Sequence, residues 1–301
     1  MAPSGSSTGK QLGSIWKPGG LTFWQLVRRV VHGINDDDLF GRASELAYNF
    51  LLALFPLLLF ILTLFGLFAR GSELQRSLLS YFADFLPPPA FQLLKAIMSE
   101  MAANATSGKL TFGIVLTLWF ASGGTSSMIS TLDAVYHVRE SRSWFRRRII
   151  ALALTIAILT LLIASLFLVL VGGHFSDWIA IKFHLMSIVV IVWEGLQWVA
   201  LVLFLTLAFS LIYYFGPSLE QRRWHWMTPG SIFGSFLWLA ASAGLRVYLH
   251  FFNTYTATYG SLGAMMILLV WLYVTGLAFL IGGEINAQIE RTTSGSRLSH
   301  R

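Results

Sequence analysis

The sequence contains no cysteine and few charged residues. The lack of cysteine excludes disulfide bonds and thiolate metal sites. Charged residues make up 12% of the 301 residues, against the roughly 25% that is usual in soluble domains. Apolar residues make up 55%. This balance excludes an ordinary soluble domain and indicates a membrane protein.

Motifs of enzymes are also missing. The sequence has no P-loop, no nucleophile elbow and no zinc motif. A metal-dependent nuclease needs several His, Asp or Glu that converge on divalent ions, and the histidines show no paired ligand spacing. We therefore expect no enzyme, no catalytic residue, no cofactor and no metal. The scattered histidines are His32, His137, His174, His184, His225, His250 and His300.

Six uncharged or nearly uncharged runs are long enough to cross a bilayer, which takes about 20 residues of helix. They predict an all-α, polytopic membrane helix bundle within residues 21–290, between disordered tails at 1–20 and 291–301. No apolar run precedes the first span, so we expect that span to remain as an anchor and not to be cleaved as a signal peptide. The six spans are about 46–69, 110–132, 149–171, 187–215, 229–251 and 261–283.

The basic residues predict the orientation of these spans. Most Lys and Arg precede the first span, follow the sixth, or lie between spans two and three or four and five. Basic residues near span ends stay in the cytoplasm, so both termini are predicted to be cytoplasmic. The net charge of +7 could indicate nucleic-acid binding, but its place in short loops favours anionic lipid headgroups and no nucleic-acid partner.

An amphipathic pattern follows the first span, on the outer side. Apolar residues repeat at helical spacing on both sides of Pro87–Pro89, which predicts an outer amphipathic helical hairpin within 70–109. The two helices could cap the bundle, or could lie in the outer leaflet and shape an entry for an apolar molecule.

Two ionisable residues lie deep in spans four and five. At 1.5 Å per residue, Glu194 lies about 10 Å and Arg246 about 8 Å from the outer ends of their spans. We predict a pair between them, with Gln197 and His250 one turn away, in an outer ligand-binding groove. The alternative is that each side chain extends outward to the headgroups.

Polar residues also gather at the cytoplasmic span ends. Spans one, two and six predict an inner polar layer, in which Glu284 could hold Arg42 or an arginine of the 139–148 loop. The alternative for each residue is an ordinary helix end in water, but the carboxylates together favour a network. The predicted layer consists of Arg42, Glu45, Asp133, Glu284 and Asn286.

Four blocks resemble the YihY/BrkB family of bacterial inner-membrane proteins. They are "ELAYNFLLALFPLLLF" (45–60), "LDAVYHVRESRSWFRRRIIALALT" (132–155), "YYFGP" with "RRWHWMTPGSIFGSFLWL" (213–239), and "NTYTATYGSLGAMMILLVWLYVTGLAFLIGGEINAQIE" (253–290). The resemblance covers about residues 20–290 and implies a multi-pass protein of the bacterial inner membrane with six spans. It also implies a role in envelope integrity or lipid movement, while an older ribonuclease BN label of the family is regarded as mistaken.

These observations favour a transporter or transport accessory for an amphipathic lipid. Membrane lipids are the expected partners, together with other envelope transport proteins. With no ATP-binding motif, the energy would come from a partner or a gradient. A non-transporting envelope scaffold is the alternative, in which the buried polar residues only hold the bundle together, and a ribonuclease is the weakest interpretation.

Overall fold

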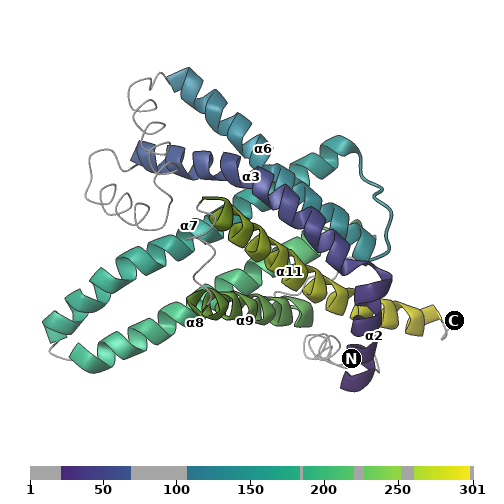
Figure 1. Ribbon diagram of the computed structural model, residues 1–301. Coiled ribbons are helices and arrows are strands. Elements are labelled where there is room, and N and C mark those ends of the chain that lie inside the picture. Colours follow the sequence, from purple (N-terminus) through teal and green to yellow (C-terminus); the bar gives the residue numbers. More distant parts are fainter. Residues whose placement is uncertain (1–21, 69–106, 184–185, 220–226, 252–260, 299–301) are drawn as a thin grey trace, which may run out of the picture.

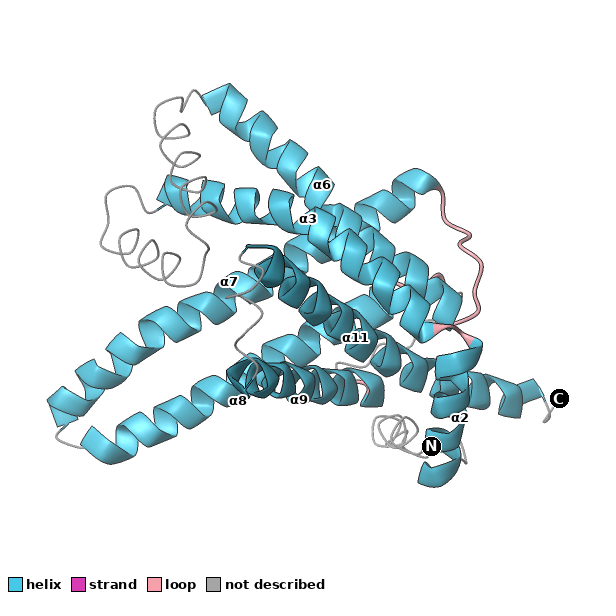
Figure 2. Cartoon of the chain, in the orientation of Figure 1, coloured by secondary structure: helices cyan, strands magenta, loops and turns pink. Residues whose placement is uncertain are grey.

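The computed structural model describes residues 22–68, 107–183, 186–219, 227–251 and 261–298. Within these ranges the chain forms seven helices and no strand (Figures 1 and 2). The predicted all-α class is confirmed. The helices are α2 (Phe23–Asp36), α3 (Leu39–Phe68), α6 (Ser107–Val135), α7 (Trp144–Phe183), α8 (Met186–Phe215), α9 (Pro229–Phe251) and α11 (Ser261–Leu298).

Four of the helices contain segments that are long and apolar enough to cross a membrane. Only 11% to 33% of each segment is buried inside the protein, so large apolar side chains such as Phe167, Trp198 and Phe236 face outward. Helices with such apolar exteriors are suited to lipid and not to water. The segments are Trp144–Val169, Gly195–Phe215, Pro229–Leu249 and Met265–Thr292.

The six predicted spans fall in turn on α3, α6, α7, α8, α9 and α11. The helices begin or end beyond several predicted bounds, because packed helices continue through polar residues that an apolar run does not include. Of the predicted outer hairpin, only residues 107–109 are described, and they begin α6. The rest of the hairpin and the tail at 1–20 lie outside the described residues.

The end of α11 differs from the predicted disordered tail at 291–301. The helix continues to Leu298. Arg291 donates a hydrogen bond to the carbonyl of Val135 in α6, and Arg29 Nη1 in α2 donates to Thr292 Oγ1 over 3.2 Å. These contacts hold the first residues beyond 290 in the helix, and a small, polar composition alone does not reveal them.

Helix α11 lies at the centre of the bundle. It packs against α9, α3, α2 and α6, while α3 pairs with α6 and α7 pairs with α8 (Figure 1). An aromatic cluster joins α8 to α11: the rings of Tyr213 and Phe279 are stacked at 5.1 Å, with Phe209 edge-on to both. Tyr213 Oη donates to the Phe279 carbonyl over 2.6 Å, which satisfies the one polar atom of the cluster.

A close crossing joins α9 to α11. A Cβ on Gly230 would lie 2.0 Å from the carbonyl oxygen of Gly282, so the two helices approach at a distance that only glycine permits. Asn286 fixes the same crossing: its Oδ1 accepts from the Gly230 N–H over 2.9 Å, and its Nδ2 donates to Thr228 Oγ1 over 2.9 Å. The Asn286 side chain therefore satisfies backbone at the first turn of α9.

Candidate functional site

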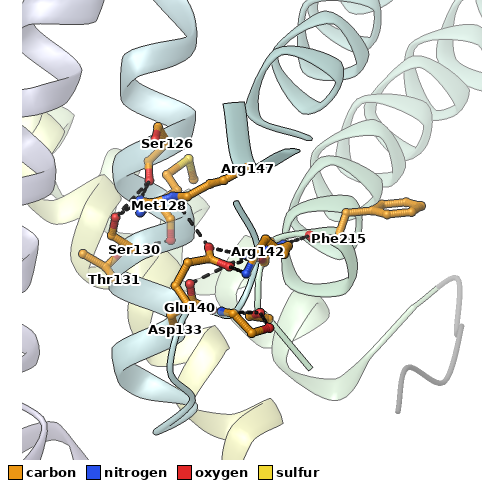
Figure 3. A network of polar contacts seen from close by, with 12 residues as sticks. Ser126, Met128, Ser130, Thr131, Asp133, Glu140, Arg142, Arg147 and Phe215 are labelled. Carbon is orange, nitrogen blue, oxygen red and sulfur yellow. Dashed lines mark hydrogen bonds and ion pairs between the residues drawn. The ribbon is translucent and has the colours of Figure 1, made fainter. Parts of the chain in front are cut away.

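One group of polar contacts ties the α6–α7 connection to the end of α8 (Figure 3). We call it the Arg142 network; its members are Asp133, Glu140, Arg142 and Arg147. Arg142 Nε and Nη2 donate to the two carboxylate oxygens of Glu140 over 2.7 and 2.8 Å, and Nη2 also reaches the carbonyl of Gly216 over 2.8 Å. This two-pronged geometry is the strongest form of an arginine–carboxylate pair.

The charges of the Arg142 network are balanced. Asp133 Oδ2 lies 3.7 Å from Arg142 Nη2, and Asp133 Oδ1 accepts from the Ser218 N–H over 2.7 Å. Arg147 Nε lies 3.7 Å from Glu140 Oε2. Burial raises the pKa of Glu140, but the hydrogen bonds from Arg142 outweigh it and lower that pKa to about 2. Two acids therefore face two arginines.

Several arginines of the predicted 139–148 loop form contacts within the protein. Arg147 Nη2 donates to the Ser126 carbonyl over 3.0 Å and to Ser130 Oγ. Arg148 donates to the Trp119 carbonyl and lies over the Trp119 ring at 4.4 Å. Arg139 and Arg146 are exposed. The end of the predicted loop, residues 144–148, is the start of α7, and several of its arginines are already bound within the protein.

A second group of polar contacts surrounds Glu284. We call it the Glu284 network; its members are Asp37, His137, Glu284 and Arg291. Glu284 is fully buried and accepts a hydrogen bond from Gln288 Nε2 over 2.7 Å. Asp37 follows α2 and is 8% exposed; its Oδ1 lies 2.5 Å from His137 Nε2, and its Oδ2 lies 3.8 Å from Arg291 Nη2. Here two acids face one arginine and one histidine.

Gly33 lets α2 approach this network. A Cβ on Gly33 would lie 2.0 Å from Glu284 Oε1, so any larger residue would displace the carboxylate or the helix. Gly33 itself is buried in α2. The place of Glu284 therefore depends on the docking of α2 against α11.

A pocket of about 430 Å³ opens beside the Glu284 network. Most of its ionisable residues are basic, because α2 contributes two arginines and α11 a third. We call it the arginine pocket. It is lined by Arg28, Arg29, His32, Gly33, Asp36, Asp37, His137, Gln288 and Arg291.

The predicted outer groove is described only in part. Gln197 Nε2 donates to the Leu168 carbonyl of α7 over 2.7 Å, so this amide joins α8 to α7. Arg246 of α9 is exposed. The side chains of Glu194 and His250 lie outside what the structure describes, and the pair between Glu194 and Arg246 stays a prediction.

The residues predicted for the inner polar layer separate into different settings. Asp133 belongs to the Arg142 network, Glu284 to the Glu284 network, and Asn286 to the α9–α11 crossing. Arg42 Nε donates to the Asp37 carbonyl over 2.7 Å. Glu45 is exposed. Arg42 and Glu284 thus share Asp37 as a neighbour, while Asp133 and Asn286 have other partners.

Sequence reasoning missed Asp37, His137, Glu140 and Arg291 as members of these networks. It offered the arginines of the 139–148 loop to Glu284, whereas Arg142 and Arg147 contact Asp133 and Glu140. The run "NDDD" at 35–38 has a composition typical of a helix cap, and Asp38 Oδ1 accepts from the Gly41 N–H over 3.2 Å at the start of α3. Its neighbour Asp37 turns inward. Gly33 lies four residues before Asp37, one helical turn away, and is buried in α2. A glycine at this spacing is the sequence signal that could have shown which face of α2 is covered.

Metal binding finds no support in the described part of the chain. No group of three or more His, Asp or Glu side chains there could hold a metal ion. What the two networks can do is hold helices together, bind anions through arginine, and bind or release protons through carboxylates and histidine.

Long apolar helices around a buried polar layer define a polytopic helical membrane protein. The family described as virulence factor BrkB matches residues 30–301, and the chain belongs to that family. A ribonuclease-like protein of Bacillus subtilis, YfkH, is 33% identical over 255 residues, which are 83% of this chain and 90% of that protein.

Two UPF0761 membrane proteins are also similar to the chain. The one from Tolumonas auensis is 27% identical over 283 residues, 91% of this chain and 88% of its own length. The one from Photobacterium profundum is 29% identical over 272 residues, 88% of this chain and 79% of its own. No solved structure matches the chain.

Proposed function

We propose that this protein is a transporter or transport accessory for an amphipathic lipid in the bacterial inner membrane. In this proposal α3, α6, α7, α8, α9 and α11 supply six spans, an amphipathic hairpin lies on the outer side, and both termini are cytoplasmic. The protein is not an enzyme. Its partners are membrane lipids and other envelope transport proteins.

The arginine pocket is the observation that carries this proposal. It lies beside α2, which is amphipathic and exposes Phe23 and Trp24, each at 74%. Exposed aromatic side chains next to basic residues are typical of helices that lie in the headgroup region of a membrane. A pocket bordered by such a helix could receive a headgroup directly from the bilayer.

Two arginines of the pocket keep an unneutralised charge for an anion, and one of them, Arg29, also donates to Thr292 Oγ1. Within the described residues, neither Arg28 nor Arg29 forms an ion pair, whereas Arg291 is near Asp37. A phosphate offers pairs of oxygen acceptors that the planar guanidinium group can bind through two hydrogen bonds. The favoured cargo is therefore a lipid with a phosphate in its headgroup.

The alternative is an envelope scaffold. It is favoured by the balanced Arg142 network and by the close α9–α11 crossing, both of which would lock the bundle. The two functions differ in what the pocket does, because a scaffold does not need a bound headgroup there.

Native mass spectrometry of protein purified in a gentle detergent tests the proposal. We compare wild type with the double variant Arg28→Ala and Arg29→Ala. The matched control is Arg139→Ala with Arg146→Ala, which removes the same charge from exposed positions outside the pocket. A defined phosphate lipid that is lost only from the first variant supports the proposal. Bulk annular lipid that is equal in all three samples favours the scaffold.

A further inference from the structure

Glu284 and Asp37 form an unusual contact in the described structure. Glu284 is fully buried on α11 and Asp37 is 8% exposed after α2, and the two carboxyl groups are close enough to interact. Glu284 Oε2 and Asp37 Oδ2 are both buried, and neither accepts a hydrogen bond from any donor among the described side chains. Two acceptors in contact can be satisfied together only if one of them carries a proton.

The surrounding charges also require a proton. An unpaired buried carboxylate is costly, and two carboxylates in contact cannot both be ionised without compensation. Arg291 compensates one negative charge near Asp37. Arg42 is bound to the backbone carbonyl of Asp37 and not to its carboxylate, so a proton, either between the two acids or on His137, is the direct way to compensate the second negative charge.

Other ionisable groups also surround this site. Arg42 Nε donates to the Asp37 carbonyl over 2.7 Å, and Tyr136 and Glu290 lie close by. The further ionisable residues that share the pocket with Asp37 are Arg28, Arg29, His32 and Asp36.

We propose that Glu284 and Asp37 form a proton-binding site that exchanges with the cytoplasmic water through His137. His137 Nε2 lies 2.5 Å from Asp37 Oδ1, and the His137 side chain is 58% exposed. In the exchange step, the carboxyl O–H bond breaks and an N–H bond forms at His137 Nε2. The exposed imidazolium exchanges its N–H protons with water and then returns one proton to the acid pair, so the two acids and His137 again hold one proton among them.

The location of the proton changes the distribution of charge among the residues that line the arginine pocket. With the proton between the acids, His137 is neutral and the acid pair carries one negative charge, which Arg291 balances. With the proton on His137, both acids are ionised and the imidazolium supplies the second positive charge. Asp37, His137 and Arg291 all line the pocket, so the same net charge is distributed differently around a ligand.

This site would let the protein bind and release a proton on the side where the arginine pocket opens. The contact between Gly33 and Glu284 places α2 directly against the site. Movement of the proton therefore changes the charge next to the helix that borders the pocket. The proton site itself does not depend on lipid as the cargo.

Infrared difference spectroscopy of the purified full-length protein tests the proposal. At neutral pH, wild type should show the C=O band of a protonated carboxyl group, with the small shift that deuterium causes. The band should be lost in Glu284→Gln and lost or shifted in Asp37→Asn. The controls Asp36→Asn and Glu45→Gln change exposed acids and should leave it unchanged.

His137→Gln tests the exchange route. It should keep the band but slow its hydrogen–deuterium exchange several-fold, whereas a change in packing alone would leave the exchange rate as it is. Absence of a protonated carboxyl band in wild type at neutral pH would overturn the proposal, even if the variants do not fold. A band that survives unchanged in both Glu284→Gln and Asp37→Asn would overturn it as well. Lipid loss and the carboxyl band are separate readouts, so either proposal can fail alone.

Discussion

The Arg142 and Glu284 networks lie around the same end of α6, but they have different chemistry. Each places two acids against two basic groups at the α6–α7 connection. In the Arg142 network both basic groups are arginines, which stay charged at any physiological pH. In the Glu284 network one of them is His137, which can lose its charge. The arginines of the first network therefore stay charged, whereas His137 lets a proton move in the second; in the first network, burial raises the pKa of Asp133 to about 6.

The two networks also differ in what surrounds them. The Arg142 network joins α6 to the end of α8 by hydrogen bonds to backbone as well as to side chains. The Glu284 network borders the arginine pocket and a helix with exposed aromatic residues. This contrast indicates that buried charge alone does not mark a functional site. A surplus of titratable groups next to an open pocket is more informative.

The largest effect is expected for Arg142→Ala. It would leave Asp133 and Glu140 without their main partner and would free the Gly216 carbonyl, at a cost of about 3–5 kcal/mol. The measurement is the midpoint of thermal unfolding in detergent, with Arg139→Ala at an exposed position as the control. Equal midpoints for the two variants would contradict a stabilising role for Arg142.

A smaller effect is expected for Gly33→Ala. The new methyl group would overlap Glu284 Oε1, so α2 must shift from α11, at a cost of about 1–3 kcal/mol. The global unfolding midpoint should fall modestly, while limited proteolysis should cut α2 faster. Gly123→Ala is the matched control, because a Cβ there meets nothing within 4 Å. Similar proteolysis of the two variants would argue against tight docking of α2.

The smallest effect is expected for the contribution of Glu140 to the pH dependence of stability. The folded-state pKa of this group is lowered from 4.5 to about 2, so its contribution to stability is fully present above pH 4.5 and is lost as the pH falls toward about 2. In Glu140→Gln, the loss of stability between these pH values should be less steep than in wild type. Parallel stability curves from pH 5 to about pH 2 would disprove the assignment.

The sequence predicted the helices well because apolar runs of about 20 residues leave the backbone few alternatives in a membrane. It also identified Asp133 and Glu284 as polar residues at unusually apolar positions. The helix ends were less predictable, because contacts such as that of Arg291 with the Val135 carbonyl depend on which helices meet.

The partners of those acids could not be predicted. The α6–α7 connection places His137 at a positive φ of 55°, and this turn directs its ring to Asp37, a hundred residues away in the chain. Helical periodicity does not encode such a turn. In the same way, Gln197 was expected beside Glu194 in a groove, but its amide donates to the Leu168 carbonyl. A backbone carbonyl of any residue can accept such a bond, so the sequence does not identify this partner.

The most direct test of the contrast compares Asp133→Asn with Glu284→Gln by thermal unfolding at neutral pH in the same detergent. Asp133→Asn removes a charge that Arg142 needs and should cost about 1–3 kcal/mol. In Glu284→Gln the amide can donate where the shared proton lay, so the midpoint should change little or rise. A lower midpoint for Glu284→Gln than for Asp133→Asn would contradict the account, because Glu284 would then act as an ionised partner.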